Sequence, residues 1–223
     1  MKENELKILD LKESILEDND RDAQLLREEM RAEGTYYINV MSSPGSGKTS
    51  SILRLIDELK DDYKIGVLEA DIDGDVDTAT MLEAGVASVQ LHTGGMCHLD
   101  ADMSRQALKE IGSAELDIVI LENVGNLVCP AEFDTGANIN LVILSVPEGD
   151  DKPLKYPLIF EKADAVLLNK TDALPVFDFD TAKFRENVAA RRQDAPVFEV
   201  SARTGDGFAE VGDWIRAKVK EVK

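Results

Sequence analysis

Short apolar segments alternate with helical stretches through most of this 223-residue chain, and this alternation restricts the possible fold more than any other feature. Strands that alternate with helices predict a parallel sheet with helices on both faces. Residues 118–121 and 141–144 are entirely apolar, which is typical of strands covered on both sides. We therefore expect a doubly wound, mainly parallel α/β fold. The predicted strands span residues 36–41, 65–69, 86–91, 117–122, 139–146, 165–169 and 196–200.

The first part of the chain has a different pattern, with scattered apolar residues among many charges up to Gly34. This pattern predicts N-terminal helices, which either cover the sheet or bind a partner. We divide the chain into an N-terminal helical segment, 1–33, and one domain, 34–223, because the length is too short for two full-sized domains.

A phosphate-binding loop follows the first predicted strand and leads into a helical stretch. Glycines let backbone N–H groups curl around phosphates, Lys48 reaches the β and γ phosphates, and the Thr49 hydroxyl ligates Mg²⁺. Ser42 stands where this motif usually has its first glycine. Because a predicted strand precedes the loop and a predicted helix follows it, the sequence predicts a P-loop NTPase fold. The expected phosphate-binding residues are Ser43, Pro44, Gly45, Ser46, Gly47, Lys48, Thr49 and Ser50.

A second motif, Asn169-Lys170-Thr171-Asp172, predicts the base. The Asp172 carboxylate can accept from guanine N1–H and its 2-amino group, whereas adenine offers neither donor. Asn169 would support the loop, and the Lys170 stem would pack on the purine. Downstream, the backbone of a short loop would meet guanine O6. The sequence thus predicts GTP and GDP as ligands. That short loop is Ser201-Ala202-Arg203.

Acidic residues can complete the magnesium and γ-phosphate site. Glu122 ends a predicted strand, and Gly125 follows closely enough to approach the γ-phosphate. Asp71 is our candidate for Mg²⁺ or the attacking water, and Asp77 is a second, although an aspartate here could equally cap a helix. We therefore assign catalysis to Lys48, Asp71 and Glu122, and Mg²⁺ to Thr49, Asp71 and Glu122. Without an evident catalytic glutamine or arginine, hydrolysis should be slow.

The two cysteines of the chain lie near these motifs. Cys97 precedes His98 in a loop with two glycines, and Cys129 follows Glu122. Two thiolates and an imidazole suit Zn²⁺ or Ni²⁺, with an open position for exchange. The alternative is a pair of inert, partly buried cysteines. Asp102 is either a fourth ligand or a surface carboxylate.

Composition excludes several classes of partner. A net charge of −19 argues against nucleic acid and anionic membranes. No apolar run approaches the roughly 20 residues that cross a bilayer. A thiol kept beside a histidine favours a reducing compartment, so we expect a cytoplasmic protein.

Together these motifs resemble the HypB family, the nickel-incorporation GTPases of [NiFe]-hydrogenase maturation. The resemblance covers the chain from about residue 36 to its end, and its most specific run is Glu122-Asn123-Val124-Gly125-Asn126-Leu127-Val128-Cys129-Pro130. The P-loop, the 95–98 segment, residues 148–157 and the 169–172 motif support it.

This resemblance implies a homodimer promoted by GTP, with a nickel or zinc site of Cys97, His98 and Cys129 near the interface. It implies that Lys152 or Lys155 contacts the nucleotide or the partner subunit. It also implies that a small zinc-containing protein docks on the N-terminal segment and that the hydrogenase large subunit receives the metal indirectly. No histidine-rich stretch is present, so a storage role is not expected.

Three alternatives remain at this stage. A metal-responsive scaffold could use GTP only to set its oligomeric state, with negligible turnover. A P-loop kinase would bind adenine and carry an arginine-rich lid, and neither feature is evident. A related GTPase serving urease or a cobalamin enzyme would share the nucleotide motifs, but the 95–98 segment and Cys129-Pro130 argue against it.

Overall fold

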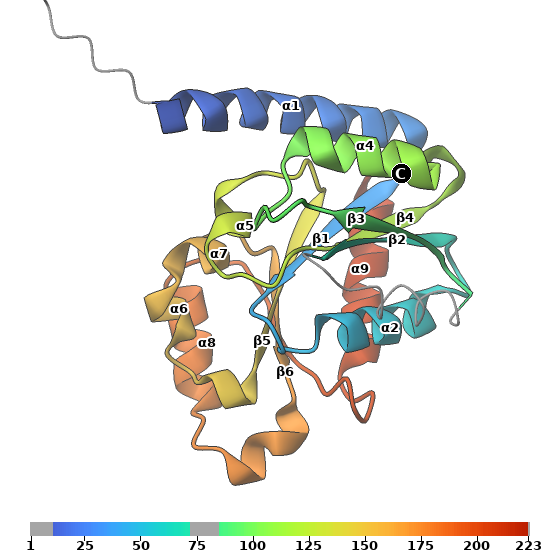
Figure 1. Ribbon diagram of the computed structural model, residues 1–223. Coiled ribbons are helices and arrows are strands. Elements are labelled where there is room, and N and C mark those ends of the chain that lie inside the picture. The colour runs from blue at the N-terminus through green and yellow to red at the C-terminus, as the bar shows by residue number, and fades with distance from the viewer. Residues whose placement is uncertain (1–10, 72–84, 223) are drawn as a thin grey trace, which may run out of the picture.

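The computed structural model describes residues 11–71 and 85–222, with the side chains of 15–70 and 85–221. Within these residues one sheet has the strand order β3-β2-β4-β1-β5-β6-β7, and every pairing is parallel (Figure 1). All seven predicted strands are confirmed, with small differences at their ends. They are β1 (Tyr36–Ser42), β2 (Ile65–Asp71), β3 (Ala87–His92), β4 (Ile118–Glu122), β5 (Ile139–Ser145), β6 (Ala165–Asn169) and β7 (Val197–Glu199).

Helices connect the strands and cover both faces of the sheet, as the doubly wound fold requires (Figure 1). The α-helices are α1 (Leu11–Glu33), α2 (Lys48–Leu59), α4 (Ala101–Ile111), α5 (Cys129–Glu132), α6 (Lys152–Lys155), α7 (Pro157–Glu161), α8 (Thr181–Ala189) and α9 (Phe208–Val222). Three short 3-10 turns complete the described elements, namely η1 (Ser113–Glu115), η2 (Val146–Glu148) and η3 (Thr171–Val176).

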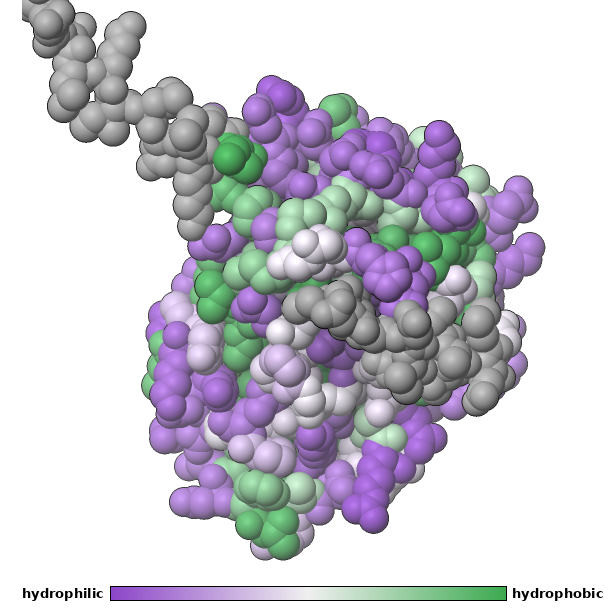
Figure 2. All heavy atoms as spheres, viewed as in Figure 1, coloured by the Kyte–Doolittle hydropathy of each residue, from purple (hydrophilic) through white to green (hydrophobic). Residues whose placement is uncertain are grey.

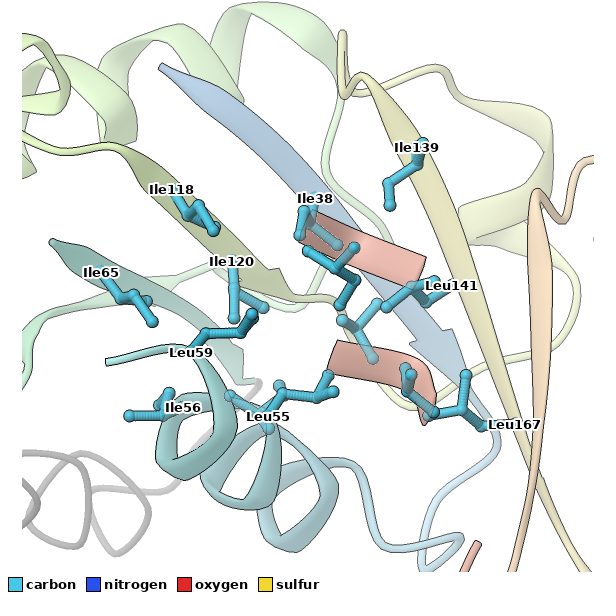
Figure 3. Close-up of a cluster of buried hydrophobic side chains, with 14 of the residues drawn as sticks. Ile38, Leu55, Ile56, Leu59, Ile65, Ile118, Ile120, Ile139, Leu141 and Leu167 are labelled. Atoms are coloured by element: carbon cyan, nitrogen blue, oxygen red, sulfur yellow. The ribbon is translucent and has the colours of Figure 1, made fainter. Parts of the chain in front are cut away.

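One face of the sheet packs against α2 and α9. Leu55 and Leu59 of α2 point toward Ile38 and Ile120 of the central strands (Figure 3). The other face is covered in two halves, by α1 and α4 over one and by α7 and α8 over the other. Because strand residues alternate between faces, nearly every residue of the central strands is buried, which explains their continuous apolar sequence.

The N-terminal segment forms a single helix over its described residues, whereas the sequence predicted several. Its inner stripe of Ala23, Leu26 and Met30 is buried against the sheet. Gly34, with a φ of 79°, ends the helix, and the Thr35 N–H donates to the Met30 carbonyl at 3.0 Å. This left-handed glycine is a common helix terminator. Helix α1 therefore covers the sheet.

The surface is mostly hydrophilic on the face shown in Figure 2, with small separate apolar groups. One such group at the lower edge lies over η3, where Val176 is 79% exposed. In the described part of the chain, no helix is both long enough and apolar enough to span a membrane.

Candidate nucleotide site and thiol cluster

The predicted phosphate-binding loop lies between β1 and α2. Gly45 and Gly47 have φ angles of 75° and 95°, a region that side chains beyond glycine rarely adopt. Helix α2 begins at Lys48, and Gly47 at its N-cap leaves the first N–H groups without a side-chain cap. Such a helix start is suited to binding phosphate.

Ser42 is the residue that departs from the usual motif, and its contacts show why a serine fits there. It is the last residue of β1 and is fully buried, and its hydroxyl donates to the Ser43 carbonyl at 2.7 Å. The Lys48 Nζ donates to the same hydroxyl at 3.1 Å. A serine here therefore holds the lysine amine at the base of the loop.

The two described magnesium candidates meet at the carboxyl edge of the sheet. Glu122 lies beside Val40 in the β1–β4 register, and its Oε1 accepts from the Thr49 hydroxyl at 2.8 Å. Hard oxygen donors of this kind suit Mg²⁺. Gly125 lies against the P-loop, since a Cβ there would stand 3.2 Å from Pro44 atoms.

Asp71 ends β2 at the same sheet edge, in register with His92. Its side chain lies outside the described residues, and so does Asp77 together with the rest of residues 72–84. The structure thus brings together Thr49 and Glu122 and places the Asp71 backbone on their edge of the sheet.

The base motif lines a cavity of about 330 Å³ next to the P-loop, which is large enough for a small ligand. Asp172 Oδ1 accepts from the Ser201 hydroxyl at 2.7 Å, and Arg203 stands 3.8 Å from the other oxygen. Asn169 donates to the Ser46 carbonyl at 2.8 Å and accepts from the Ala202 N–H at 3.0 Å. The predicted guanine residues therefore form one connected site.

Two contacts in this region were not foreseen. The Lys170 amine donates to the Gly45 carbonyl at 2.6 Å, and Lys170 adopts a φ of 61°, so this residue ties the base motif to the phosphate loop. Arg54 of α2 donates to the carbonyls of Ala202 and Arg203 at 2.9 and 3.1 Å. Within an ordinary amphipathic helix, no sequence signal marks Arg54 for this role.

The 148–157 motif reaches the P-loop through its glutamate. Glu148 accepts hydrogen bonds from Ser43 of the loop and from Ser145 at the end of β5. The two predicted lysines have local partners: Lys155 pairs with Asp151 at 2.6 Å, and the Lys152 amine lies 5.5 Å from the Tyr156 ring centroid.

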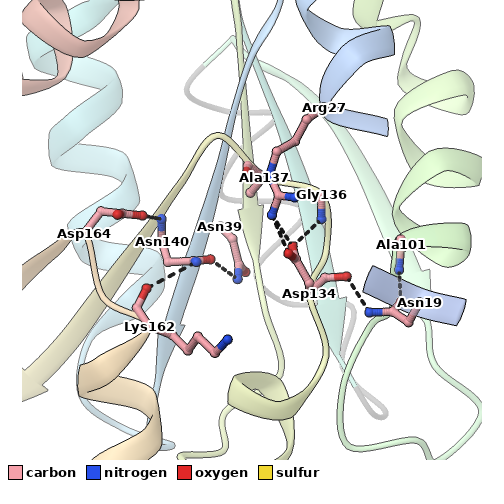
Figure 4. Close-up of polar contacts among 10 residues, drawn as sticks. All are labelled: Asn19, Arg27, Asn39, Ala101, Asp134, Gly136, Ala137, Asn140, Lys162 and Asp164. Carbon is pink, nitrogen blue, oxygen red and sulfur yellow. Dashed lines mark hydrogen bonds and ion pairs between the residues drawn. The ribbon is translucent and has the colours of Figure 1, made fainter. Parts of the chain in front are cut away.

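A chain of side-chain amides runs across the sheet from the loop after Glu122. Asn123 donates to Asn39 at 3.1 Å, and Asn39 donates to Asn140 at 2.9 Å. Asn140 then donates to the Lys162 carbonyl at 3.3 Å (Figure 4). Because Asn39 and Asn123 are buried, their amide groups require these partners. These hydrogen bonds hold the start of the loop after Glu122 in place relative to β1 and β5.

The predicted metal ligands are neighbours. Cys97 Sγ lies 3.8 Å from His98 Nδ1, in a loop whose Gly94 and Gly95 have φ angles of 62° and 90°. Cys129 is a neighbour of Cys97, and its interaction with Cys97, followed by burial, raises the pKa of the Cys129 thiol. Both cysteines are free thiols.

His98 is held by a ring contact that the sequence did not indicate. Its imidazole stacks on Phe133, with centroids 3.7 Å apart and an interplanar angle of 15°. Burial lowers the pKa of His98, while Asp100 and Glu132 act in the opposite direction. The neutral imidazole favoured by burial is the form that ligates a metal.

Two carboxylates near this cluster have other partners. Asp102 accepts from Gln106 at 2.8 Å on the helix surface, and Asp100 caps α4 by accepting from the Met103 N–H. Among the side chains that the structure describes, 15–70 and 85–221, no three of His, Cys, Asp or Glu are grouped closely enough to hold an ion. The thiols and the imidazole thus lie side by side and do not form a closed coordination sphere.

The fold and this site define a P-loop nucleotide-binding protein with two neighbouring thiols. Comparisons with known proteins agree. Residues 36–199 match the family described as CobW/HypB/UreG, nucleotide-binding domain. The chain belongs to the HypB family of hydrogenase maturation factors. This confirms the sequence resemblance and sets the kinase alternative aside.

Individual relatives cover almost the whole chain. The hydrogenase/urease maturation factor HypB of Helicobacter hepaticus is 42% identical over 216 residues, which are 95% of this chain and 88% of that protein. The crystal structure of HypB from Helicobacter pylori in complex with nickel has a TM-score of 0.85 and 41% identity, covering 92% of this chain and 96% of that one. The crystal structure of HypB from Archaeoglobus fulgidus has a TM-score of 0.84 and 36% identity, covering 91% of this chain and 99% of that one.

Proposed function

We propose that this hydrogenase maturation factor is a GTP-hydrolysing metallochaperone that binds Ni²⁺ or Zn²⁺ and helps deliver nickel to the [NiFe]-hydrogenase. The observation that carries the proposal is the short segment from Glu122 to Cys129. Its first residue accepts a hydrogen bond from the P-loop threonine at 2.8 Å, and its last residue is a neighbour of the Cys97 thiol. A rearrangement at the γ-phosphate therefore reaches a metal ligand through a few residues of chain.

The nucleotide part of the proposal is GTP with Mg²⁺. Asp172 at the cavity selects guanine, Lys48 neutralises phosphate charge, and Thr49, Glu122 and Asp71 supply oxygen ligands to the ion. Slow intrinsic turnover follows, since neither the P-loop, 42–49, nor the 122–125 segment carries an arginine or glutamine.

The metal part rests on the donor set. Two thiols and an imidazole suit Ni²⁺ or Zn²⁺ better than Mg²⁺ or Ca²⁺. The thiols must lose their protons when the ion binds, because the thiolate is the ligand. Nickel is the cargo in this proposal. The nickel complex of the H. pylori relative supports the choice of metal.

We further propose a homodimer promoted by GTP, with its interface beside the thiols. Met96 and Val128 support this, because they are apolar, 45% and 50% exposed, and directly flank Cys97 and Cys129. In this dimer Lys152 or Lys155 would contact the nucleotide or the partner subunit. The side chain of Lys155 is 61% exposed and thus accessible.

A small zinc-containing accessory protein would dock on the N-terminal segment and pass nickel toward the hydrogenase large subunit. Helix α1 supports this proposal with its outward apolar residues Ile15 and Leu25, which are 56% and 48% exposed. The free thiols support a cytoplasmic location.

Nickel titration of the nucleotide-free, GDP and GTP-analogue forms, with and without Cys129→Ala, tests this function. We expect nickel affinity to differ between the nucleotide forms and to fall in the variant. Equal affinity in all three forms would contradict the coupling. Single-turnover GTP hydrolysis, read as phosphate release, separates the metallochaperone from a scaffold, because a scaffold would bind GTP with negligible turnover.

A further inference from the structure

A buried asparagine of α1 joins the two segments that carry the thiols. Asn19 is 8% exposed. Its Nδ2 donates to the Asp134 carbonyl at 3.0 Å, and its Oδ1 accepts from the Ala101 N–H at 2.9 Å (Figure 4). Both hydrogen bonds connect parts of the chain that are distant in sequence, and one side-chain amide makes both.

Each end of this bridge lies close to a predicted metal ligand. Ala101 is the first residue of α4 and comes shortly after His98 in the chain. Asp134 lies shortly after α5, which begins at Cys129. The stacking of His98 on Phe133, the residue before Asp134, adds a second contact between the same two segments. The hydrogen bonds of Asn19 therefore connect the segment that carries Cys97 and His98 with the segment that carries Cys129.

The neighbouring contacts hold the 134–137 loop on α1. Arg27 forms an ion pair with Asp134 at 2.5 Å and donates to the Ala137 carbonyl at 2.9 Å. Gly136 lies so close to α1 that a Cβ there would stand 2.8 Å from Leu26. Figure 4 shows Arg27, Asp134 and Asn19 converging from α1 and this loop.

A cavity of about 310 Å³ lies between the neighbouring part of α1 and the Cys129 segment, lined by Leu16 and Asp20 of α1 and by Pro130 and Phe133. Without the amide, the Ala101 N–H and the Asp134 carbonyl lose their common partner. Buried polar groups cost free energy when left unpaired, so the two segments would shift to find water or other partners.

We propose that Asn19 is a positioning residue for the thiol cluster: it sets the separation of Cys97 and His98 from Cys129 by holding their segments to α1. The inference rests on the proposed function for its consequence in metal binding. The effect of Asn19 on the separation of the two thiols does not depend on metal binding. Groups that hydrogen-bond directly to metal ligands are typically worth roughly 10- to 100-fold in metal affinity, and Asn19, which acts on the segments that carry the ligands, should lie at the lower end of this range.

Two substitutions separate the bonds of the bridge. Asn19→Ala removes both, whereas Asn19→Asp keeps an acceptor for the Ala101 N–H and loses the donor to the Asp134 carbonyl. Arg105→Ala is the matched control, because Arg105 joins α4 to α1 through Glu29 at 3.0 Å and the Asp22 carbonyl at 3.1 Å. That control loosens the same pair of helices without touching the bridge.

The first readout needs no metal. Dibromobimane becomes strongly fluorescent when it links two neighbouring thiols, so the rate of fluorescence gain in the full-length, metal-free protein reports the separation of Cys97 and Cys129. We expect Asn19→Ala to slow this bridging several-fold, Asn19→Asp to be intermediate, and Arg105→Ala to match the wild type. The second readout is nickel affinity, followed by thiolate-to-nickel absorption, with an expected loss of roughly 10-fold for Asn19→Ala.

Wild-type bridging rates in Asn19→Ala would overturn the inference, and so would an equal slowing in Arg105→Ala. Binding of a GTP analogue confirms that each variant is folded. If Asn19→Ala fails this check, Asn19→Asp decides, and a wild-type rate in it overturns the inference. A wild-type protein that binds no nickel would contradict the proposed function, whereas the bridging assay would still decide the role of Asn19.

Discussion

The Thr49 hydroxyl donates a 2.8 Å hydrogen bond to Glu122, although 73 residues separate the two in the chain. The contact arises because β4 lies beside β1 and both strands end at the same edge of the sheet. The two oxygen donors proposed for Mg²⁺ are thus brought together at the edge of the sheet, where α2 begins.

Removing the Thr49 hydroxyl should impair GTP hydrolysis more than it impairs folding. We expect Thr49→Ala to lower GTP turnover about 10²-fold, because the ion that neutralises the phosphates loses a ligand. Thr49→Ser keeps the hydroxyl and should retain most activity. Single-turnover hydrolysis over a range of Mg²⁺ concentrations measures both, and similar losses in the two variants would show that the hydroxyl is not the relevant group.

The two P-loop glycines should differ in their tolerance of a methyl group. A Cβ at Gly47 would stand 2.6 Å from the Asn169 amide nitrogen, whereas one at Gly45 meets nothing within 4 Å. Both have positive φ, so each alanine variant carries backbone strain of about 1 to 3 kcal/mol. Only Gly47→Ala should also displace the base motif. We expect Gly47→Ala to lower both the free energy of urea unfolding and the affinity for GTP more than Gly45→Ala does. Equal losses in the two variants would contradict the close approach of Gly47 to Asn169.

Base selectivity should reside in Asp172. Replacing its carboxylate with an amide in Asp172→Asn should weaken GTP binding by roughly 10- to 100-fold, as expected for charged hydrogen bonds. It should also favour xanthosine triphosphate, whose C2 carbonyl can accept from the new amide. The control Ser201→Ala removes the 2.7 Å bond to Asp172 and should weaken binding without changing the preferred base. Fluorescent nucleotide competition measures both effects.

Stability should fall at alkaline pH because of a buried tyrosine in β1. Burial raises the pKa of Tyr37 well above its ordinary value, an effect opposed by the Ser104 and Thr135 hydroxyls. Its contribution to stability is therefore fully present below about pH 10 and is lost as pH rises further, when the unfolded state ionises first.

Tyr37→Phe should remove this component. Up to about 1.4 kcal/mol per pH unit of the wild-type decline should disappear in the variant above pH 10. Urea unfolding of both proteins between pH 8 and 11 measures it. Parallel stability curves would show that Tyr37 does not resist ionisation in the folded protein.

Local patterns were enough to predict much of this molecule. Apolar runs predicted the strands most clearly where both faces are covered, as in β4 and β5, because such a strand must be apolar along its length. The P-loop and Asn169-Lys170-Thr171-Asp172 were recognisable because their chemistry needs neighbouring residues at fixed spacing. The helical character of the N-terminal segment was also predicted, and one continuous helix spans its described part.

Other relationships involve residues that look ordinary in sequence. Nothing local distinguishes Asn19, Arg54 or Asn39, yet each makes a hydrogen bond to a residue far along the chain. Their roles depend on which strand lies beside which and on where α1 packs.

The sequence by itself therefore determined the fold class, the guanine nucleotide motifs and the identity of the candidate metal ligands. Only the tertiary structure decided how these parts are joined: Thr49 to Glu122, Cys129 to Cys97, and both thiol segments to Asn19. The physical reason is that strand order and helix packing set distances between remote residues, and hydrogen bonds form only where those distances allow.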